Sequence, residues 1–118
     1  MKNIFIISQE SCNLCHLKET LPHTRWIHHK HSEEGIASIS LYGHQLHAVF
    51  ISENVSFLDT LQIQKLIKTQ FPSLPIMLIR SFTDIIDCIQ GNYTHRCLAS
   101  YDDFQSIQIL LRPPVCLT

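Results

Sequence analysis

The chain has few of the residues that several large protein classes need. It contains three glycines and five prolines among 118 residues, so neither a glycine-rich phosphate loop nor low-complexity disorder is expected. No apolar run approaches the roughly 20 residues of a membrane span. The first run, Ile4–Ile7, is also shorter than the apolar region of a signal peptide, about 7–15 residues. We therefore expect a globular domain without a membrane segment.

The charge balance excludes a second group of functions. Nine basic residues stand against ten acidic ones, and the basic residues are dispersed, so we expect no direct binding to nucleic acid or to an anionic membrane. Five cysteines are an odd number, and a domain of this size does not need disulfide bonds, which favours a reducing cytoplasm. The length fits one domain over residues 1–112, and Pro113-Pro114 in residues 113–118 resembles the start of a linker or tail.

Apolar runs alternate with helical patterns along the chain, which is typical of βαβ units around a parallel sheet. The expected strands are Asn3–Ser8, Thr24–His28, Leu46–Ile51, Ile76–Ile79 and Arg96–Ala99. The expected helices are one that carries Leu14, Leu17 and Leu21 and ends near Pro22, then Ser32–Leu41, Phe57–Gln70, Thr83–Gln90 and Asp102–Leu111. The pattern predicts an α/β fold with five strand-helix pairs.

Details of the helices follow from their residue types. Ser32 is the expected N-cap of its helix, and Gly43 is expected to end that helix. Two other helices present apolar side chains at helical spacing to the interior. These side chains are Leu58, Leu61, Ile63, Leu66 and Ile67 in one helix, and Phe104, Ile107 and Leu111 in the other.

Five strand-helix pairs, with Phe71-Pro72-Ser73-Leu74-Pro75 leading into the fourth strand, resemble the receiver domain of bacterial response regulators over nearly the whole chain. The resemblance implies a flavodoxin-like, doubly wound (βα)₅ fold with strand order 2-1-3-4-5. It also implies a site at the carboxyl ends of the strands. Receivers in two-component systems carry there a pair of carboxylates for Mg²⁺, a phospho-accepting aspartate, a hydroxyl residue and a lysine.

Most of these receiver positions hold other residues in this chain. Gln9 and Glu10 stand at the carboxylate pair, and Ser52 stands at the acceptor position, with Glu53 there if the register slips by one residue. Arg80 or Ser81 falls at the hydroxyl position, and Ser100 replaces the lysine. Serine lacks the charge that holds the metal and is a far weaker phosphoryl acceptor. These positions therefore predict a degenerate phosphorylation site without cofactor or enzymatic activity.

The resemblance then implies a pseudo-receiver, a regulatory and dimerisation domain of a bacterial transcription regulator that works without phosphorylation. Such a domain acts as a homodimer or docks on a downstream ATPase or DNA-binding domain in a longer chain. Its usual contact face is formed by the fourth helix, fifth strand and fifth helix. On this face we expect Thr83, Asp84, Asp87, Tyr101, Asp102, Asp103, Gln105 and Gln108.

Arg80 has a specific predicted role at the degenerate site. If its side chain points to the vacant site, it can pair with Glu10 or Glu53 and replace the missing metal by an internal ion pair.

A redox function is the main alternative. Cys12-Asn13-Leu14-Cys15 directly follows the first strand at a helix start, which is the placement of a thioredoxin-like or glutaredoxin-like pair. A glutaredoxin needs a proline before its third strand, close to the thiols, whereas Pro75 here precedes the fourth strand. Two small side chains at a helix start remain the simpler interpretation.

Zinc binding is the second alternative. Cys12 and Cys15 form a usable half-site, and His29 and His31 could supply two more ligands on one side of a strand end. Their spacing matches no familiar zinc motif, so a solvated polar edge is the favoured interpretation of these histidines.

Overall fold

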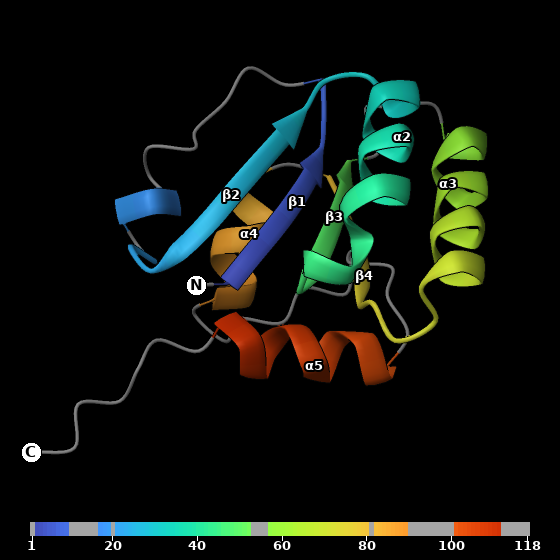
Figure 1. The fold of residues 1–118 in the computed structure, drawn as a ribbon. Helices are drawn as coiled ribbons and strands as arrows, with labels where there is room; N and C mark the ends of the chain where they lie inside the picture. The colour runs from blue at the N-terminus through green and yellow to red at the C-terminus, as the bar shows by residue number, and fades with distance from the viewer. Residues whose placement is uncertain are drawn as a thin grey trace, which may run out of the picture.

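The core of the structure is a parallel sheet of four strands. The computed structural model describes residues 2–9, 17–19, 21–52, 57–80, 82–89 and 101–111. The strands are β1 (Lys2–Ile7), β2 (Thr24–His29), β3 (Ala48–Ser52) and β4 (Ile76–Ile79), in the order β2-β1-β3-β4 (Figure 1). All three pairings are parallel. The predicted order of the first four strands is confirmed, and the predicted fifth strand, Arg96–Ala99, lies outside the described residues.

The described helices follow the predicted positions closely. They are α2 (Ser32–Tyr42), the short 3₁₀ helix η1 (Gly43–Gln45), α3 (Phe57–Gln70), α4 (Phe82–Ile89) and α5 (Tyr101–Leu111). The bounds of α3 and β4 agree with the predicted ones residue for residue. A helical turn at 17–19 lies within the first predicted helix, whose Leu17 and Leu21 are buried as expected. No helix in the described ranges is long and apolar enough to cross a membrane.

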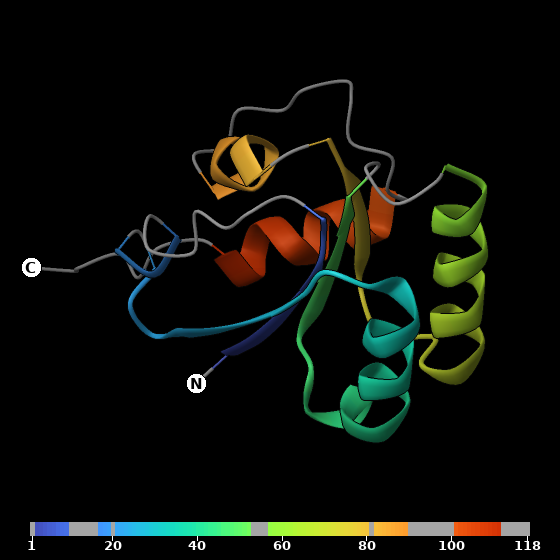
Figure 2. The ribbon, with the colours of Figure 1, turned by 90° about the horizontal axis from the view of Figure 1, so that it is seen from above.

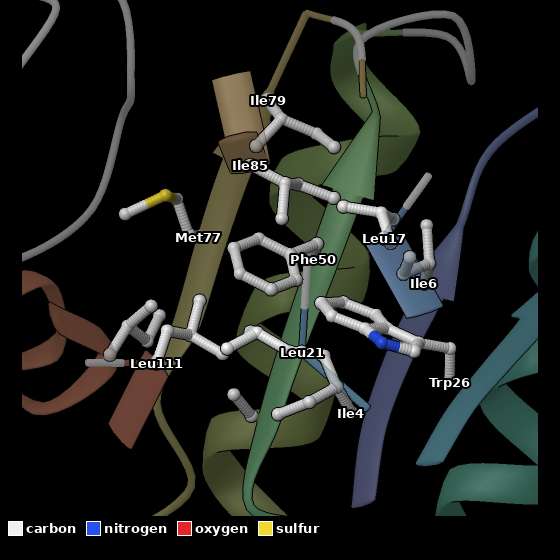
Figure 3. Close-up of a cluster of buried hydrophobic side chains, with 12 residues drawn as sticks. Ile4, Ile6, Leu17, Leu21, Trp26, Phe50, Met77, Ile79, Ile85 and Leu111 are labelled. Atoms are coloured by element: carbon white, nitrogen blue, oxygen red, sulfur yellow. The ribbon is translucent and has the colours of Figure 1, made fainter. Parts of the chain in front are cut away.

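Helices cover both faces of the sheet (Figure 2). On one face, here called the α5 face, Ile4, Ile6, Phe50, Met77 and Ile79 pack against side chains of α4, α5 and the segment 17–21 (Figure 3). On the other, the α2 face, residues of β1, β3 and β4 pack against α2 and α3. Because side chains alternate along a strand, burial of every residue in Ala48–Ser52 and Ile76–Ile79 requires both layers.

The apolar stripe of α3 is narrower than predicted. Ile63 and Ile67 are buried, but Leu61 is 37% exposed and Leu66 is 50% exposed. Among the described side chains of α3, the buried stripe consists of Thr60, Ile63 and Ile67, at spacing i, i+3, i+7, so Leu61 and Leu66 lie on its two flanks, and the side chain of Leu58 lies outside the description. The prediction that both leucines face the interior is therefore wrong.

The predicted N-cap of α2 is wrong, whereas its predicted end is confirmed, because α2 ends at Tyr42 with Gly43 as its C-cap. The N-cap is His31, in extended conformation and without a side-chain capping bond, and Ser32 is the first helical residue. At the other end, Gly43 has φ −56°, a right-handed conformation that any residue adopts, and the chain continues into η1. Gly43 is needed for space instead, because a Cβ there would lie 2.3 Å from Cε2 of Phe71.

The position of α4 differs from that in a doubly wound sheet of order 2-1-3-4-5. Ile85 and Ile86 of α4 pack on the α5 face, whereas α3 packs on the α2 face. Crossovers between parallel strands are right-handed, so a step from β4 to a strand outside it would place α4 beside α3. Figure 2 shows α4 and α3 on opposite sides of the sheet. The regular winding therefore holds as far as β4 and is not continued by α4.

Helix α5 crosses the strands near their amino-terminal ends (Figure 1). Its first turn is held by Asp103, whose carboxylate accepts bonds from Lys68 Nζ at 2.8–2.9 Å and from the Ile76 backbone N–H at 3.2 Å. At its other end, the Leu110 carbonyl accepts a bond from Lys2 Nζ. The starts of β4 and β1 thus fix the two ends of α5.

We expect Asp103→Asn to lower the free energy of unfolding by about 1–3 kcal/mol. Asp103 is buried, and the substitution removes the charge that pairs with Lys68 and weakens the acceptor for the Ile76 N–H. Urea denaturation measures the loss. Asp102→Asn is the matched control, because Asp102 is exposed in the same helical turn and its substitution should change stability by less than about 0.5 kcal/mol. Equal losses in both variants would contradict an anchoring role.

We expect Gly43→Ala to destabilise the fold by about 1–3 kcal/mol, because the new methyl group overlaps the Phe71 ring. A double-mutant cycle with Phe71→Ala tests the cause. In the Phe71→Ala background the alanine at 43 meets no ring, so the substitution should cost much less. A cost that is unchanged in that background would show that the ring contact is not responsible.

Candidate functional site

The predicted site lies at the carboxyl edge of the sheet, where β1, β3 and β4 end together. The register pairs Ile7 with Ile51 and Ser52 with Ile79. Ser52, the last residue of β3, therefore lies at this edge together with Ser8 and Arg80, which directly follow β1 and β4. In open parallel sheets this is the usual place for ligands. The edge can therefore be compared position by position with the expected site.

Ser52, at the predicted acceptor position, is the last residue of β3 and is 0% exposed. Ser8 is also buried, and its backbone is engaged on both sides. Its N–H donates to the His29 carbonyl at 3.0 Å, and its carbonyl oxygen lies 2.8 Å from His28 Nε2. A phosphoryl acceptor must be reached by the donor from solvent. The described part of this edge is closed at both serines.

A hydrogen bond joins Arg80, just before α4, to Asp84 in the first turn of the helix. The Arg80 backbone N–H donates to Asp84 Oδ2 at 2.8 Å, and Asp84 is buried. The carboxylate reaches back to the chain just before the helix, as in a capping box, and it sits where the helix dipole favours a negative charge. This carboxylate therefore stabilises a helix end. The side chain of Arg80 is exposed, and its predicted partners Glu10 and Glu53 lie outside the described residues.

The other predicted positions divide into two groups. Gln9 is exposed, while Ser81 and Ser100 lie outside the described residues. Within the ranges that are described, no three His, Cys, Asp or Glu side chains are placed to hold a metal ion. β3 ends at Ser52, which is the predicted acceptor position.

The predicted contact residues also differ in accessibility. Helices α4 and α5 touch each other on the α5 face, which brings the predicted residues of both helices to one side of the sheet. The exposed ones are Thr83, Asp102 and Gln105, the half-buried ones are Asp87 and Gln108, and the side chain of Tyr101 lies outside the described residues. Asp84 and Asp103 are buried and bind partners within the chain, so they support the helices from inside.

The histidines proposed as zinc ligands are separated by the end of the strand. His29 is the last residue of β2, stacks on Phe5 with ring centroids 5.0 Å apart, and has Nε2 3.4 Å from Ser38 Oγ. His31 is the exposed N-cap of α2. The alternation that would place both on one side stops at His29. Cys12 and Cys15 lie outside the described residues.

The position of Pro75 bears on the redox alternative. Pro75 directly precedes β4, the fourth parallel strand, and its carbonyl accepts a bond from Val49 N–H at 3.0 Å. It therefore lies at the amino edge of the sheet, whereas β1 ends at the carboxyl edge. Because Cys12 and Cys15 lie outside the described residues, the redox alternative stays a prediction from the sequence.

Two hollows in the described surface were not anticipated from the sequence. One, of about 580 Å³, lies at the amino edge between η1, the segment before β4 and α5, and His44, His47 and Phe71 line it. The other, of about 370 Å³, lies on the α2 face beside β2 and is lined by Arg25, His29 and Tyr42 among others. A possible sequence signal for the second was the alternation of Arg25, Ile27 and His29 along one strand.

The chain matches no protein-family model, no curated protein and no solved structure in three comparisons. The functional argument therefore depends on the geometry of this chain.

We expect Ser52→Asp to destabilise the protein by roughly 2–4 kcal/mol, because a carboxylate would be buried at a position without solvent access. Ser52→Ala, which adds no charge, should cost about 1 kcal/mol. Thermal unfolding with and without Mg²⁺ measures both. If Ser52→Asp is as stable as the wild type and is further stabilised by Mg²⁺, the edge can still form a receiver-type metal site.

Proposed function

We propose that this chain is a phosphorylation-independent regulatory domain that acts through protein–protein contacts, as a pseudo-receiver does in a bacterial transcription regulator. The observation that carries the proposal is the fully buried Ser52 at the end of β3. A hydroxyl in that place neither binds a dication through charge nor meets a phosphoryl donor. The sheet order β2-β1-β3-β4 supports the receiver resemblance as far as β4.

Asp84, a described carboxylate near this edge, supports the same proposal. Asp84 is buried and is used to start α4, so it is not available as a ligand for Mg²⁺. In a receiver the charge on the aspartate after the third strand is the switch. A domain that keeps the sheet but uses Asp84 to stabilise the start of α4 needs another way to signal. A contact with a second protein chain is the simplest one.

The proposed contact surface is the solvent side of α4 and α5. Thr83, Asp102 and Gln105 are exposed there, and Ile109 of α5 is 69% exposed. An isolated apolar side chain among polar ones suits a modest interface that forms and dissociates. The proposed occupants are a second copy of the chain or a neighbouring ATPase or DNA-binding domain.

One experiment tests both parts of the proposal. Amide NMR spectra are recorded with Mg²⁺ and then with beryllofluoride, a phosphoryl mimic, and sedimentation velocity follows self-association over a concentration series. We expect no saturable shifts at Gln9, Ser52 or Arg80, and a concentration-dependent dimer that Ile109→Glu weakens. Leu41→Glu is the control, because Leu41 is an equally exposed residue on α2.

Saturable beryllofluoride shifts at the carboxyl edge would overturn the claim of phosphorylation independence. A monomer at all concentrations would remove the homodimer, and an Ile109→Glu effect equal to that of Leu41→Glu would remove the α4–α5 surface.

A further inference from the structure

The geometry points to a binding site for a small aromatic anion in the hollow between α2 and β2. The site is distinct from the carboxyl edge and does not depend on the proposed regulatory role. Its volume of about 370 Å³ falls within the range of small-molecule sites, about 300–1,000 Å³.

The register of β1 and β2 builds the floor of this hollow. Asn3 pairs with Arg25 and Phe5 with Ile27, so these four side chains occupy neighbouring positions on the α2 face. Phe5 and Leu46 are buried side chains of the lining. The His29 ring stacks on Phe5 at an interplanar angle of 17°. The floor therefore combines the apolar side chains Phe5 and Ile27 with polar ones, and part of it is aromatic.

The hollow is open because of where α2 sits. A Cβ at Gly35 would lie 2.9 Å from Ile7 Cδ1 and 3.6 Å from Phe5 Cε1, so the missing side chain lets α2 approach β1 closely. At Gly35 the helix therefore lies against Ile7 and Phe5 of β1. Beyond Gly35, the helix contributes Ser38 and Tyr42 to the lining of the hollow beside β2, and these two residues are four apart and lie on one stripe. Tyr42 is 55% exposed, so its ring forms an accessible wall.

The charged side chains that line the hollow indicate the class of ligand. Arg25 and His29 line the hollow and no carboxylate does. Arg25 forms no ion pair with the other described residues. An unpaired guanidinium beside an apolar floor favours a carboxylate or phosphate, which it can bind through two parallel hydrogen bonds. The accessible ring of Tyr42 and the apolar part of the floor favour a ring on the same molecule.

Naphthylacetate is the probe because it combines an aromatic ring with a carboxylate. Naphthylmethanol supplies only the ring, and acetate supplies only the carboxylate. In amide NMR titrations we expect naphthylacetate to give saturable shifts at Arg25, Ile27, His29, Ser38 and Tyr42. Naphthylmethanol should bind about tenfold more weakly, since it lacks the charged acceptor. Acetate should give no saturable shifts at the same concentrations.

Two matched pairs of variants locate the contacts. Arg25→Gln should weaken naphthylacetate about tenfold, whereas Lys30→Gln, an equal charge change at an exposed residue just after β2, should weaken it less than about twofold. Tyr42→Ala should weaken it several-fold, and Leu41→Ala, at the exposed neighbour, should not. All four residues are exposed, so the variants should fold.

Three results would overturn the inference. They are the absence of saturable shifts at the lining residues, equal weakening by Arg25→Gln and Lys30→Gln, and naphthylmethanol binding as tightly as naphthylacetate.

Discussion

Burial of the central strands on both faces is the constraint that the rest of this structure obeys. Every residue of β3 and β4 is buried, and so are the last four residues of β1. A parallel sheet of this kind needs a complete layer on each side, because its strands offer no polar face to water. Two clusters of apolar side chains meet that need, one under α2 and α3 and the other under α4, α5 and the segment 17–21. The helices lie where these clusters need cover.

The same constraint applies to α4, which departs from regular winding. The face that contains Phe50 and Met77 needs a cover, and α4 and α5 both pack there. A helix that crosses the strands at one end cannot be held by a strand-to-helix turn alone. It is held by polar contacts instead, from Asp103 to Lys68 and Ile76 and from Lys2 to the Leu110 carbonyl. A small number of charged groups therefore positions the element that closes the core.

Sequence patterns predicted what local chemistry determines. The apolar run Ile76–Ile79 follows a proline and is too short for a helix, so its bounds were predictable, and α3 showed a helical period over its whole length. The flanking positions of Leu61 and Leu66 were not predictable, because period alone does not give the width of the buried stripe. Two features depend on tertiary packing and have no local signal in the sequence. They are the face of the sheet on which α4 packs and the ion pair between Lys68 and Asp103, which are 35 residues apart. At the candidate site, the sequence located Ser52 at the strand end, but its burial depends on neighbours from other strands.

Burial also decides where this chain can bind other molecules. The carboxyl edge offers little to a ligand where it is described, since Ser8 and Ser52 are buried and Asp84 caps a helix. Accessible polar groups beside apolar surface occur instead where the cover is incomplete. The outer strand β2 is such a place, because Arg25 and His29 line a hollow there between β2 and α2. Where it is described, the usual ligand edge of this sheet is packed inside, whereas the outer strand β2 and the helix surfaces offer accessible groups, and both proposals place binding there.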